Sequence, residues 1–458
     1  MVFRQMRHPT TVDGCVVANF TSAQSSEIVL SRVNTLEVWS NDLSRLRASF
    51  DLHGSVTSMQ RLTLPRLGAA QHERFKQRMP DAGLDCLVLT FDDAKLSVVA
   101  YDHARPRVLR TVALYNFESL CKLPGCVPAT AGVFGAKGTV FVDPQSRAIG
   151  MVVFGSLLAV VPVREAWWDA SLDEPVADED EPDPKVGLMF ALPNKRECGN
   201  DHPSFGRPYV LPLARFGVPE HAALDACFLD GQAQPAVAVL HQGAARSWTG
   251  RMAVVRDTCT VVHIGLVPEA PLTAAAVFAC PGLPMNAHTL VPAPRGVVLV
   301  CSTNAIQYVG ASPSQRWAMA VNGFAVASVR ADVVHAMNGR AEATIGVSLD
   351  LDGMRWAWLH EGLLLVTTPG GELLEVRVHR PEGRQAMLQG RLVGARRRGI
   401  APQCRALVLA HGAEHNRQGV LSLRRREALP VWANLCRHGA ASAVKLRRFA
   451  LDRGWRAT

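Results

Sequence analysis

A short apolar hairpin pattern recurs about every sixty residues over the first three-quarters of this chain. Each copy consists of an alternating strand, a tight polar turn and a second alternating strand. The six clearest copies begin near the residues Ile28, Leu87, Met151, Val237, Val297 and Leu363, at spacings of 59, 64, 86, 60 and 66 residues. A repeated unit that cannot bury its own apolar face must stack against its neighbours, and all-β units of this kind commonly close into a propeller. The pattern therefore predicts an all-β propeller, a fold that favours partner binding over catalysis.

Composition places the chain among folded proteins. Hydrophobic residues make up 48% of the 458 residues and charged residues 19%. The 11 cysteines contain no Cys-x-x-Cys pair, which indicates reduced, buried thiols of a cytosolic or nuclear protein rather than a disulfide framework. The longest apolar stretch, residues 149–163, is too short to cross a bilayer, and the first residues lack the apolar core of a secretory signal. We therefore expect no membrane contact.

The net charge of +9 is unevenly distributed along the sequence. Residues 380–458 contain 17 Lys and Arg against 4 Asp and Glu, so the tail carries +13 and residues 1–379 carry −4. Within the body, residues 173–184 form an acidic, proline-punctuated segment without apolar periodicity, which predicts a loop between blades. The basic balance of the whole chain is thus poor support for nucleic-acid binding by the folded body.

The hairpin at residues 87–102 resembles a stretch of the large subunit of the cleavage and polyadenylation specificity factor, and further matches follow in the expected order over roughly residues 1–385. The signature residues that carry this resemblance are Asp93, Ala94, Lys95, Leu96, Ser97, Tyr101, Asp102, Trp248, Gly250, Arg251, Asp257, Thr258, Cys259, Gly370 and Gly371. We expect their roles to be structural. The family is related to the large subunit of the damaged-DNA-binding protein and to a propeller subunit of the splicing machinery.

The resemblance implies the fold and the function of the chain. Members have three seven-bladed propellers and a helical C-terminal domain, so we expect a seven-bladed propeller over residues 1–385, without the WD40 signature. Strand-forming residues at 15–20 are expected to complete the last blade and close the ring. The implied role is a non-catalytic nuclear scaffold in pre-mRNA 3′-end cleavage and polyadenylation. Its implied partners are WD-repeat and zinc-finger subunits, with RNA bound mainly through the assembled complex.

The tail at residues 386–458 departs from the family. Two explanations remain open: a basic extension in a divergent lineage, or a truncated or frame-shifted gene model. Possible phosphate contacts in this Arg-rich tail are Arg396, Arg397, Arg398, Arg424, Arg425 and Arg426. If the tail binds RNA directly, its affinity should fall steeply with salt.

The sequence also suggests alternatives to a polyadenylation scaffold. A related propeller serves as an adaptor in ubiquitin-ligase or splicing complexes. The tail motif His411-x-x-Glu414-His415 has the form of a metallopeptidase site, in which the histidines bind a metal and the glutamate acts as base. Gly412 weakens the helix that this geometry needs. Because no catalytic constellation is found in the body, we expect no enzyme activity, no cofactor, no metal and no small-molecule substrate.

Overall fold

The structure is a computed structural model in which the described residues build a ring of β-sheets. They are residues 12–65, 83–91, 94–106, 108–118, 120, 139–164, 204–243, 258–267, 271–310, 316–321, 349–369, 372–379, 387–394, 406–412 and 417–423. The acidic segment 173–184 lies outside them.

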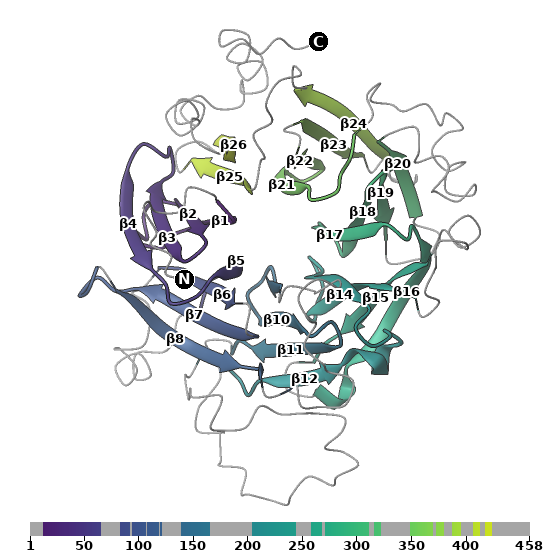
Figure 1. The fold of residues 1–458 in the computed structure, drawn as a ribbon, viewed down its shortest axis with the longest axis horizontal. Helices are drawn as coiled ribbons and strands as arrows, with labels where there is room; N and C mark the ends of the chain where they lie inside the picture. Colours follow the sequence, from purple (N-terminus) through teal and green to yellow (C-terminus); the bar gives the residue numbers. More distant parts are fainter. Residues whose placement is uncertain are drawn as a thin grey trace, which may run out of the picture.

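Six four-stranded antiparallel sheets stand around a common axis as the blades of a propeller (Figure 1). Blade 1 consists of β1 (Gly14–Ala18), β2 (Glu27–Arg32), β3 (Thr35–Ser40) and β4 (Leu46–Asp51). Blade 2 consists of β5 (Val56–Leu62), β6 (Cys86–Phe91), β7 (Lys95–Tyr101) and β8 (Leu109–Asn116). Blade 3 consists of β9 (Val140–Val142), β10 (Ala148–Val153), β11 (Leu157–Pro162) and β12 (Tyr209–Pro212).

The second half of the ring repeats this order. Blade 4 consists of β13 (Ala223–Phe228), β14 (Ala236–Gln242), β15 (Cys259–Gly265) and β16 (Ala275–Leu283). Blade 5 consists of β17 (Ala287–Ala293), β18 (Val297–Ser302), β19 (Ala305–Val309) and β20 (Arg316–Ala320). Blade 6 consists of β21 (Arg355–His360), β22 (Leu363–Thr367), β23 (Leu373–His379) and β24 (Met387–Gly394).

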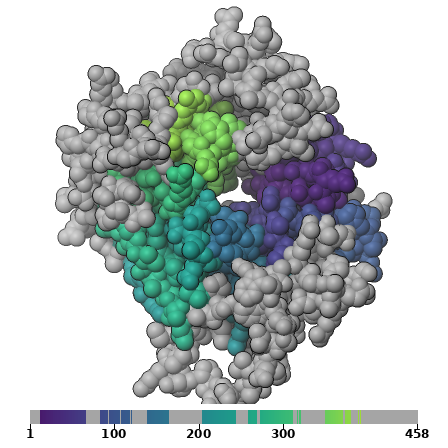
Figure 2. Space-filling view, turned by 180° about the vertical axis from the view of Figure 1, so that it is seen from behind, coloured from purple at the N-terminus to yellow at the C-terminus, as the bar shows by residue number. Residues whose placement is uncertain are grey.

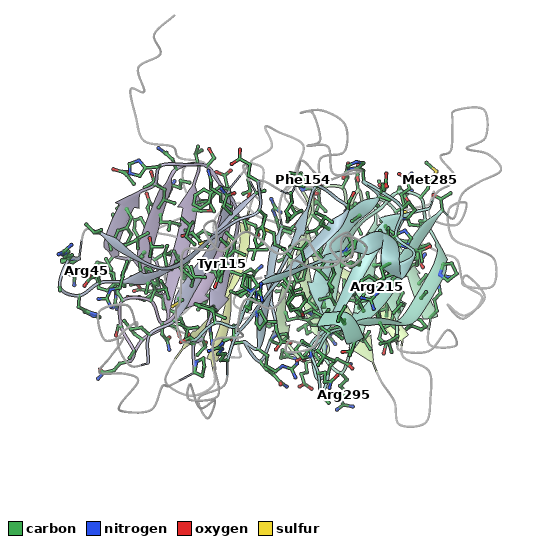
Figure 3. The ribbon with its side chains drawn as sticks, turned by 90° about the horizontal axis from the view of Figure 1, so that it is seen from below. Arg45, Tyr115, Phe154, Arg215, Met285 and Arg295 are labelled. Atoms are coloured by element: carbon green, nitrogen blue, oxygen red, sulfur yellow. The ribbon has the colours of Figure 1, made fainter. Side chains whose placement is uncertain are left out.

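Each blade begins at the centre of the ring and ends at its rim. The first strands of blades 1 to 5 contact one another in sequence around the axis, and a central opening is visible in the space-filling view (Figure 2). Seen edge-on, the ring is a disc with Phe154 and Met285 on one face and Arg295 on the other (Figure 3). The two faces therefore carry different turns and connections.

The prediction of an all-β propeller agrees with the structure, but the prediction of seven blades is wrong. Among the described residues, six four-stranded sheets are accompanied by one two-stranded hairpin, formed by β25 (Ala406–Gly412) and β26 (Arg417–Leu423). Strand β25 contacts both β21 and β1, so the hairpin lies between the last blade and the first. The described residues of this region, 387–394, 406–412 and 417–423, supply one strand to blade 6 and these two strands, which is too few for another four-stranded blade.

Two further expectations need correction. Residues 15–20 were expected to complete the last blade, but β1 pairs with β2 and is the inner strand of blade 1. Strand β24 pairs with β23 beyond the expected propeller boundary at residue 385. The alternation of Leu388, Gly390 and Leu392 within β24 continues the strand pattern into the region that the sequence assigned to a tail.

The turn between β10 and β11 shows how the sequence encodes a tight hairpin. Phe154 and Gly155 have φ of 53° and 64°, the left-handed pair typical of a type I′ turn, and the N–H of Ser156 closes this turn by donating to the carbonyl of Val153 at 3.2 Å. The backbone of His221 lies 3.3 Å from where a Cβ of Gly155 would stand. The hydroxyl of Ser156 accepts the N–H of His221 at 2.8 Å, which ties this turn to the start of blade 4.

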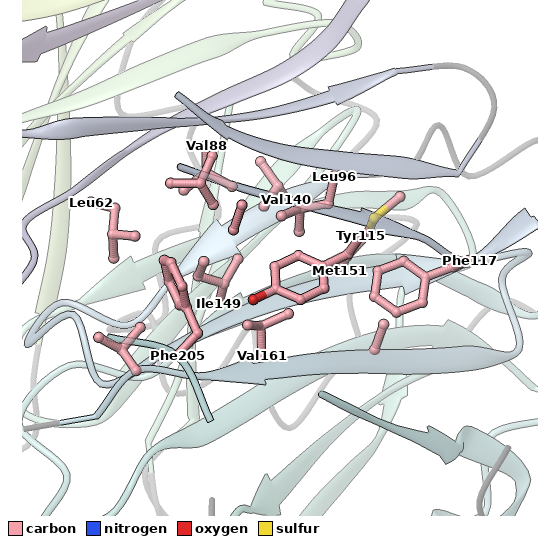
Figure 4. Close-up of a cluster of buried hydrophobic side chains, with 14 of the residues drawn as sticks. Leu62, Val88, Leu96, Tyr115, Phe117, Val140, Ile149, Met151, Val161 and Phe205 are labelled. Atoms are coloured by element: carbon pink, nitrogen blue, oxygen red, sulfur yellow. The ribbon is translucent and has the colours of Figure 1, made fainter. Parts of the chain in front are cut away.

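The large apolar clusters of the described residues lie between neighbouring blades. Blades 2 and 3 share the largest cluster, in which Leu96 and Tyr115 of blade 2 face Ile149 and Met151 of blade 3 (Figure 4). All four side chains are almost fully buried. Each large apolar side chain buried in this way contributes about 1.5–3 kcal/mol, so neighbouring blades stabilise one another.

Helices contribute little to the described structure. Short 3₁₀ turns occur within it, among them η3 (Leu213–Phe216) and η4 (Pro271–Thr273). None of the helices there has the length and apolar character needed to traverse a bilayer.

Candidate functional site

The clearest signature hairpin forms the two middle strands of blade 2. Ala94, with a φ of 56°, lies in the turn between β6 and β7. After it, Leu96 is buried in the core and Ser97 is 8% exposed. Leu96 therefore contributes to the packing of blade 2.

Tyr101 lies at the end of this hairpin and links blades 1 and 2. Its ring meets those of Phe20 and Phe50 edge-on, with centroids 6.2 Å away in both cases. The ring of His103 lies 4.9 Å away at 85°. Burial raises the pKa of the Tyr101 phenol, aided by the negative charge of Glu27. The aromatic contacts fix the position of blade 2 against blade 1.

Asp102 closes the outer edge of the same hairpin. Its Oδ1 accepts a hydrogen bond from the Arg110 guanidinium at 3.0 Å and another from the N–H of Ala104 at 3.0 Å. The hydrogen bond from Arg110 holds the pKa of Asp102 below its usual value. The ion pair thereby connects β7 to the outer strand β8.

Two buried carboxylates accept hydrogen bonds from the loop between β1 and β2. Glu27, fully buried, accepts the N–H of Thr21 at 2.5 Å and forms an ion pair with Arg47 at 2.9 Å. Asp85 accepts the N–H of Asn19 at 2.8 Å and the hydroxyl of Thr63 at 2.7 Å. Buried carboxylates satisfied in this way hold the loop before β2 in one place.

A groove opens between the outer parts of blades 1 and 2, directly beside the signature hairpin. Its volume is about 790 Å³. The lining residues are Phe50, Asp51, Leu52, His53, Gly54, Ser55, Leu89, Phe91, Lys95, Ser97, Val99, Val108, Leu109, Thr111 and Leu114. Val108 is 55% exposed and Leu114 is 45% exposed. The groove is mainly apolar with a few polar groups, the lining of a site that binds another protein.

A second groove, of about 650 Å³, lies between blades 2 and 3 and is more polar. Three arginines line it: Arg61, Arg147 and Arg164. The Arg147 guanidinium binds both oxygens of the buried Asp143 at 2.8 and 3.0 Å, and the carbonyl of Ala233 at 2.7 Å. The hydrogen bonds of Arg147 thus join blade 3 to blade 4. The groove between blades 1 and 2 is therefore the better candidate for partner binding.

The described residues contain no cluster of three or more His, Cys, Asp or Glu side chains placed to hold a metal. Burial lowers the pKa of His263 to about 4 and also lowers that of His241. Both residues lie in the middle strands of blade 4, where they are packed rather than presented to a substrate.

Two further signature residues that the structure describes, Thr258 and Cys259, lie apart from the groove. Cys259 begins β15 in blade 4, is fully buried, and its pKa is raised to about 11 by burial. The carbonyl of Thr258, next to it, accepts the N–H of Gly243 at 2.8 Å. Blade 4 does not adjoin blade 2, so the structure does not bring these signature segments together. Those outside the described residues are Asp93, Trp248, Gly250, Arg251, Asp257, Gly370 and Gly371.

The tail motifs are only partly described. His411 lies in strand β25, so the helix on which His411 and His415 would share one metal is not present at His411. Glu414, His415 and all six tail arginines predicted as phosphate contacts lie outside the described residues.

Sequence reasoning missed several residues of the site. Glu27 and Asp85 are charged residues beside or within strands that are otherwise buried, and this contrast was the available signal. The groove residues Val108 and Leu114 belong to the apolar residues at and just before β8. Their exposure depends on how blade 1 meets blade 2, which no local pattern encodes.

Comparison with known proteins finds one matching family model and several relatives. The family model described as the RSE1/DDB1/CPSF1 first β-propeller matches residues 11–331. Protein CFT1 of Kluyveromyces lactis is 27% identical over 332 residues, covering 72% of this chain and 23% of that protein. Subunit 1 of the cleavage and polyadenylation specificity factor is 26% identical in Arabidopsis thaliana over 71% of this chain and 20% of that protein. The Drosophila melanogaster subunit is 27% identical, also over 71% and 20%.

These matches confirm the resemblance inferred from the signature residues. The chain spans about a fifth of the length of the curated relatives it matches.

Proposed function

Because the chain belongs to the RSE1/DDB1/CPSF1 first β-propeller family, we propose that it is a non-catalytic scaffold in pre-mRNA 3′-end cleavage and polyadenylation, acting in the nucleus. The observation that carries this proposal is the apolar groove between blades 1 and 2, built directly on the signature hairpin. The names of its relatives support the polyadenylation role.

The proposed mechanism is the ordering of partners on a rigid disc. Tyr101 and Asp102 fix the hairpin that forms one wall of the groove. The exposed Leu114 and Val108 offer apolar contacts to an apolar segment of another polyadenylation-factor subunit, of the WD-repeat or zinc-finger class. A few buried apolar contacts of this kind carry most of the affinity of a protein interface. RNA is bound mainly through the assembled complex.

Affinity purification of the full-length tagged protein from nuclear extract tests this function. Leu114→Glu places a charge in the groove, and we expect the amount of at least one co-purifying polyadenylation subunit to fall five-fold or more. Leu46→Glu is the matched control, because Leu46 is 43% exposed on the outer strand of blade 1 and does not line the groove. Unchanged recovery of every subunit with the Leu114 variant would contradict the role of the groove.

The same purification separates the polyadenylation role from the other roles in this superfamily. Endonuclease and poly(A)-machinery subunits among the recovered proteins support the proposal. A cullin would instead indicate a ubiquitin-ligase adaptor, and spliceosomal subunits a splicing role. The family model covers all of these branches, whereas the Arabidopsis thaliana and Drosophila melanogaster relatives are named for polyadenylation.

A further inference from the structure

Strand β16 is the outer strand of blade 4, and within the described part of the chain no strand pairs with its outer edge. It is nine residues long and lies at the rim of the disc (Figure 1). An exposed edge strand presents unpaired backbone N–H and C=O groups, which form a template for another strand.

Proteins commonly guard such edges with charge, and the six outer strands differ in this respect. Four of them carry at least one arginine, namely Arg47 in β4, Arg110 in β8, Arg316 in β20 and Arg391 in β24. Strand β12 carries no charge, but its first three residues are buried and η3 follows it at once. Strand β16 is also uncharged, yet most of it is exposed. It is therefore an outer strand that combines exposure with a lack of charge.

The apolar side chains around β16 are unusually open to solvent. Val277 is 73% exposed, and Leu272 in the preceding turn η4 is 61% exposed. Among the large hydrophobic side chains of the described residues, these two are the most exposed. Ala275, Ala276 and Ala279 are exposed as well. Apolar surface gathered on one edge marks an interaction site.

Two arginines delimit the free part of the edge. The Arg215 guanidinium donates to the carbonyl of Leu272 at 2.7 Å, just before β16 begins. The Arg316 guanidinium, from blade 5, donates to the carbonyl of Pro281 at 3.1 Å and also to that of Gly282. The five residues Ala275–Ala279 remain between these positions, with a positive charge at either end.

We infer that the outer edge of β16 binds an extended segment of another polypeptide, which adds to blade 4 as a fifth strand. Only an extended backbone matches a free strand edge. The register with β15 passes from Phe278 to Ala276 and leaves Val277 as a bulge residue that projects its side chain into solvent. An apolar side chain of the segment would pack beside Val277, and carboxylates at its ends would complement Arg215 and Arg316. This inference concerns a different blade from the groove and does not depend on the proposed polyadenylation role.

A synthetic peptide provides the probe. It has nine residues, with aspartate at each end and valine alternating with threonine between them. Two further forms are N-methylated at every second backbone amide, one form at each of the two alternate sets. A methylated amide cannot donate a hydrogen bond. Fluorescence anisotropy with the full chain measures binding, and hydrogen exchange measures protection of residues 275–279. We expect the peptide to bind and protect this segment, and we expect at least one N-methylated form to bind ten-fold or more weakly.

Two variants make the test specific. Val277→Lys guards the edge with a charge, so the peptide should bind it at least ten-fold more weakly. Leu46→Lys makes the same kind of change on β4 and should leave peptide affinity unchanged. Because Val277 is mostly exposed, the variant should retain the circular dichroism spectrum and melting temperature of the parent chain. Absence of peptide binding, binding of both N-methylated forms as tight as that of the unmodified peptide, or equal binding to the Val277 variant would each overturn the inference.

Discussion

The joint between blades 2 and 3 and the joint between blades 4 and 5 solve the same packing problem with different chemistry. Blades 2 and 3 meet through an apolar cluster that includes Leu96, Tyr115, Ile149 and Met151. Blades 4 and 5 also share an apolar cluster, but a carboxylate crosses this joint: Asp225 in β13 accepts the N–H of Leu290 in β17 at 2.7 Å. Stability of the first joint should be independent of pH, whereas that of the second should vary with it.

The largest expected effect is in the apolar joint. Ile149→Ala leaves a cavity beside Met151 and should lower the free energy of unfolding by about 2–5 kcal/mol. Urea unfolding at pH 5 and pH 8 measures this loss, which should be equal at both values because no ionisable group is removed. A loss that changed with pH would contradict the expectation that the joint between blades 2 and 3 is independent of pH.

A smaller effect, with a clear pH dependence, is expected for Asp225→Asn. Burial raises the pKa of Asp225 to about 7, despite hydrogen bonds from the N–H groups of Leu290 and Ala226 that lower it. The folded state therefore binds a proton more tightly than the unfolded state. The stability associated with this proton is fully present below about pH 4 and is lost as the pH rises through 7.

The asparagine variant removes that dependence. Its stability relative to the parent chain should rise between pH 4 and 8 by at most about 4 kcal/mol, since the pKa of Asp225 is raised from 3.8 to about 7 and each pKa unit corresponds to about 1.4 kcal/mol. Thermal unfolding across this pH range measures the difference. A constant offset between parent and variant at every pH would show that the carboxylate does not titrate in the folded joint.

The smallest expected effect is at His263, on the same face of β15 as Val261 of this joint. Burial lowers the pKa of His263 to about 4, and its ring packs against Phe278 with centroids 5.0 Å apart. Here the unfolded state binds the proton more tightly, so stability is lost as the pH falls from about 6.5 to 4. His263→Leu should recover on the order of 1 kcal/mol at pH 5, measured by urea unfolding. Equal relative stability at pH 5 and pH 7 would contradict this assignment.

The sequence pattern predicted the middle of each blade better than its edges. The six repeated hairpins correspond to the six pairs of middle strands, for example β6 with β7 and β22 with β23. Middle strands are paired on both sides and buried on both faces, so their composition is strongly constrained. The inner strand β1 was assigned to the wrong blade, because which neighbour a strand pairs with is set by the ring rather than by the strand's own residues.

The blade count shows the limit of inference by resemblance. The residues themselves displayed six hairpins, and the seventh blade came from the expected family architecture. In the structure, residues 406–423 form a hairpin, with β25 contacting β21 and β1, and no further sheet of four strands is found among the described residues. The groove likewise could not be predicted, since Val108 and Leu114 of blade 2 and Phe50 of blade 1 meet only after the blades assemble.

The contacts of β25 with both β1 and β21 make the two ends of the blade series spatial neighbours. The packing between blades therefore does not depend on which blade comes first in the sequence. A circularly permuted chain that starts at blade 3 and joins β26 to β1 through a flexible linker would keep every joint between blades. Such a permutant would separate the contribution of chain connectivity to folding from that of the packed blades.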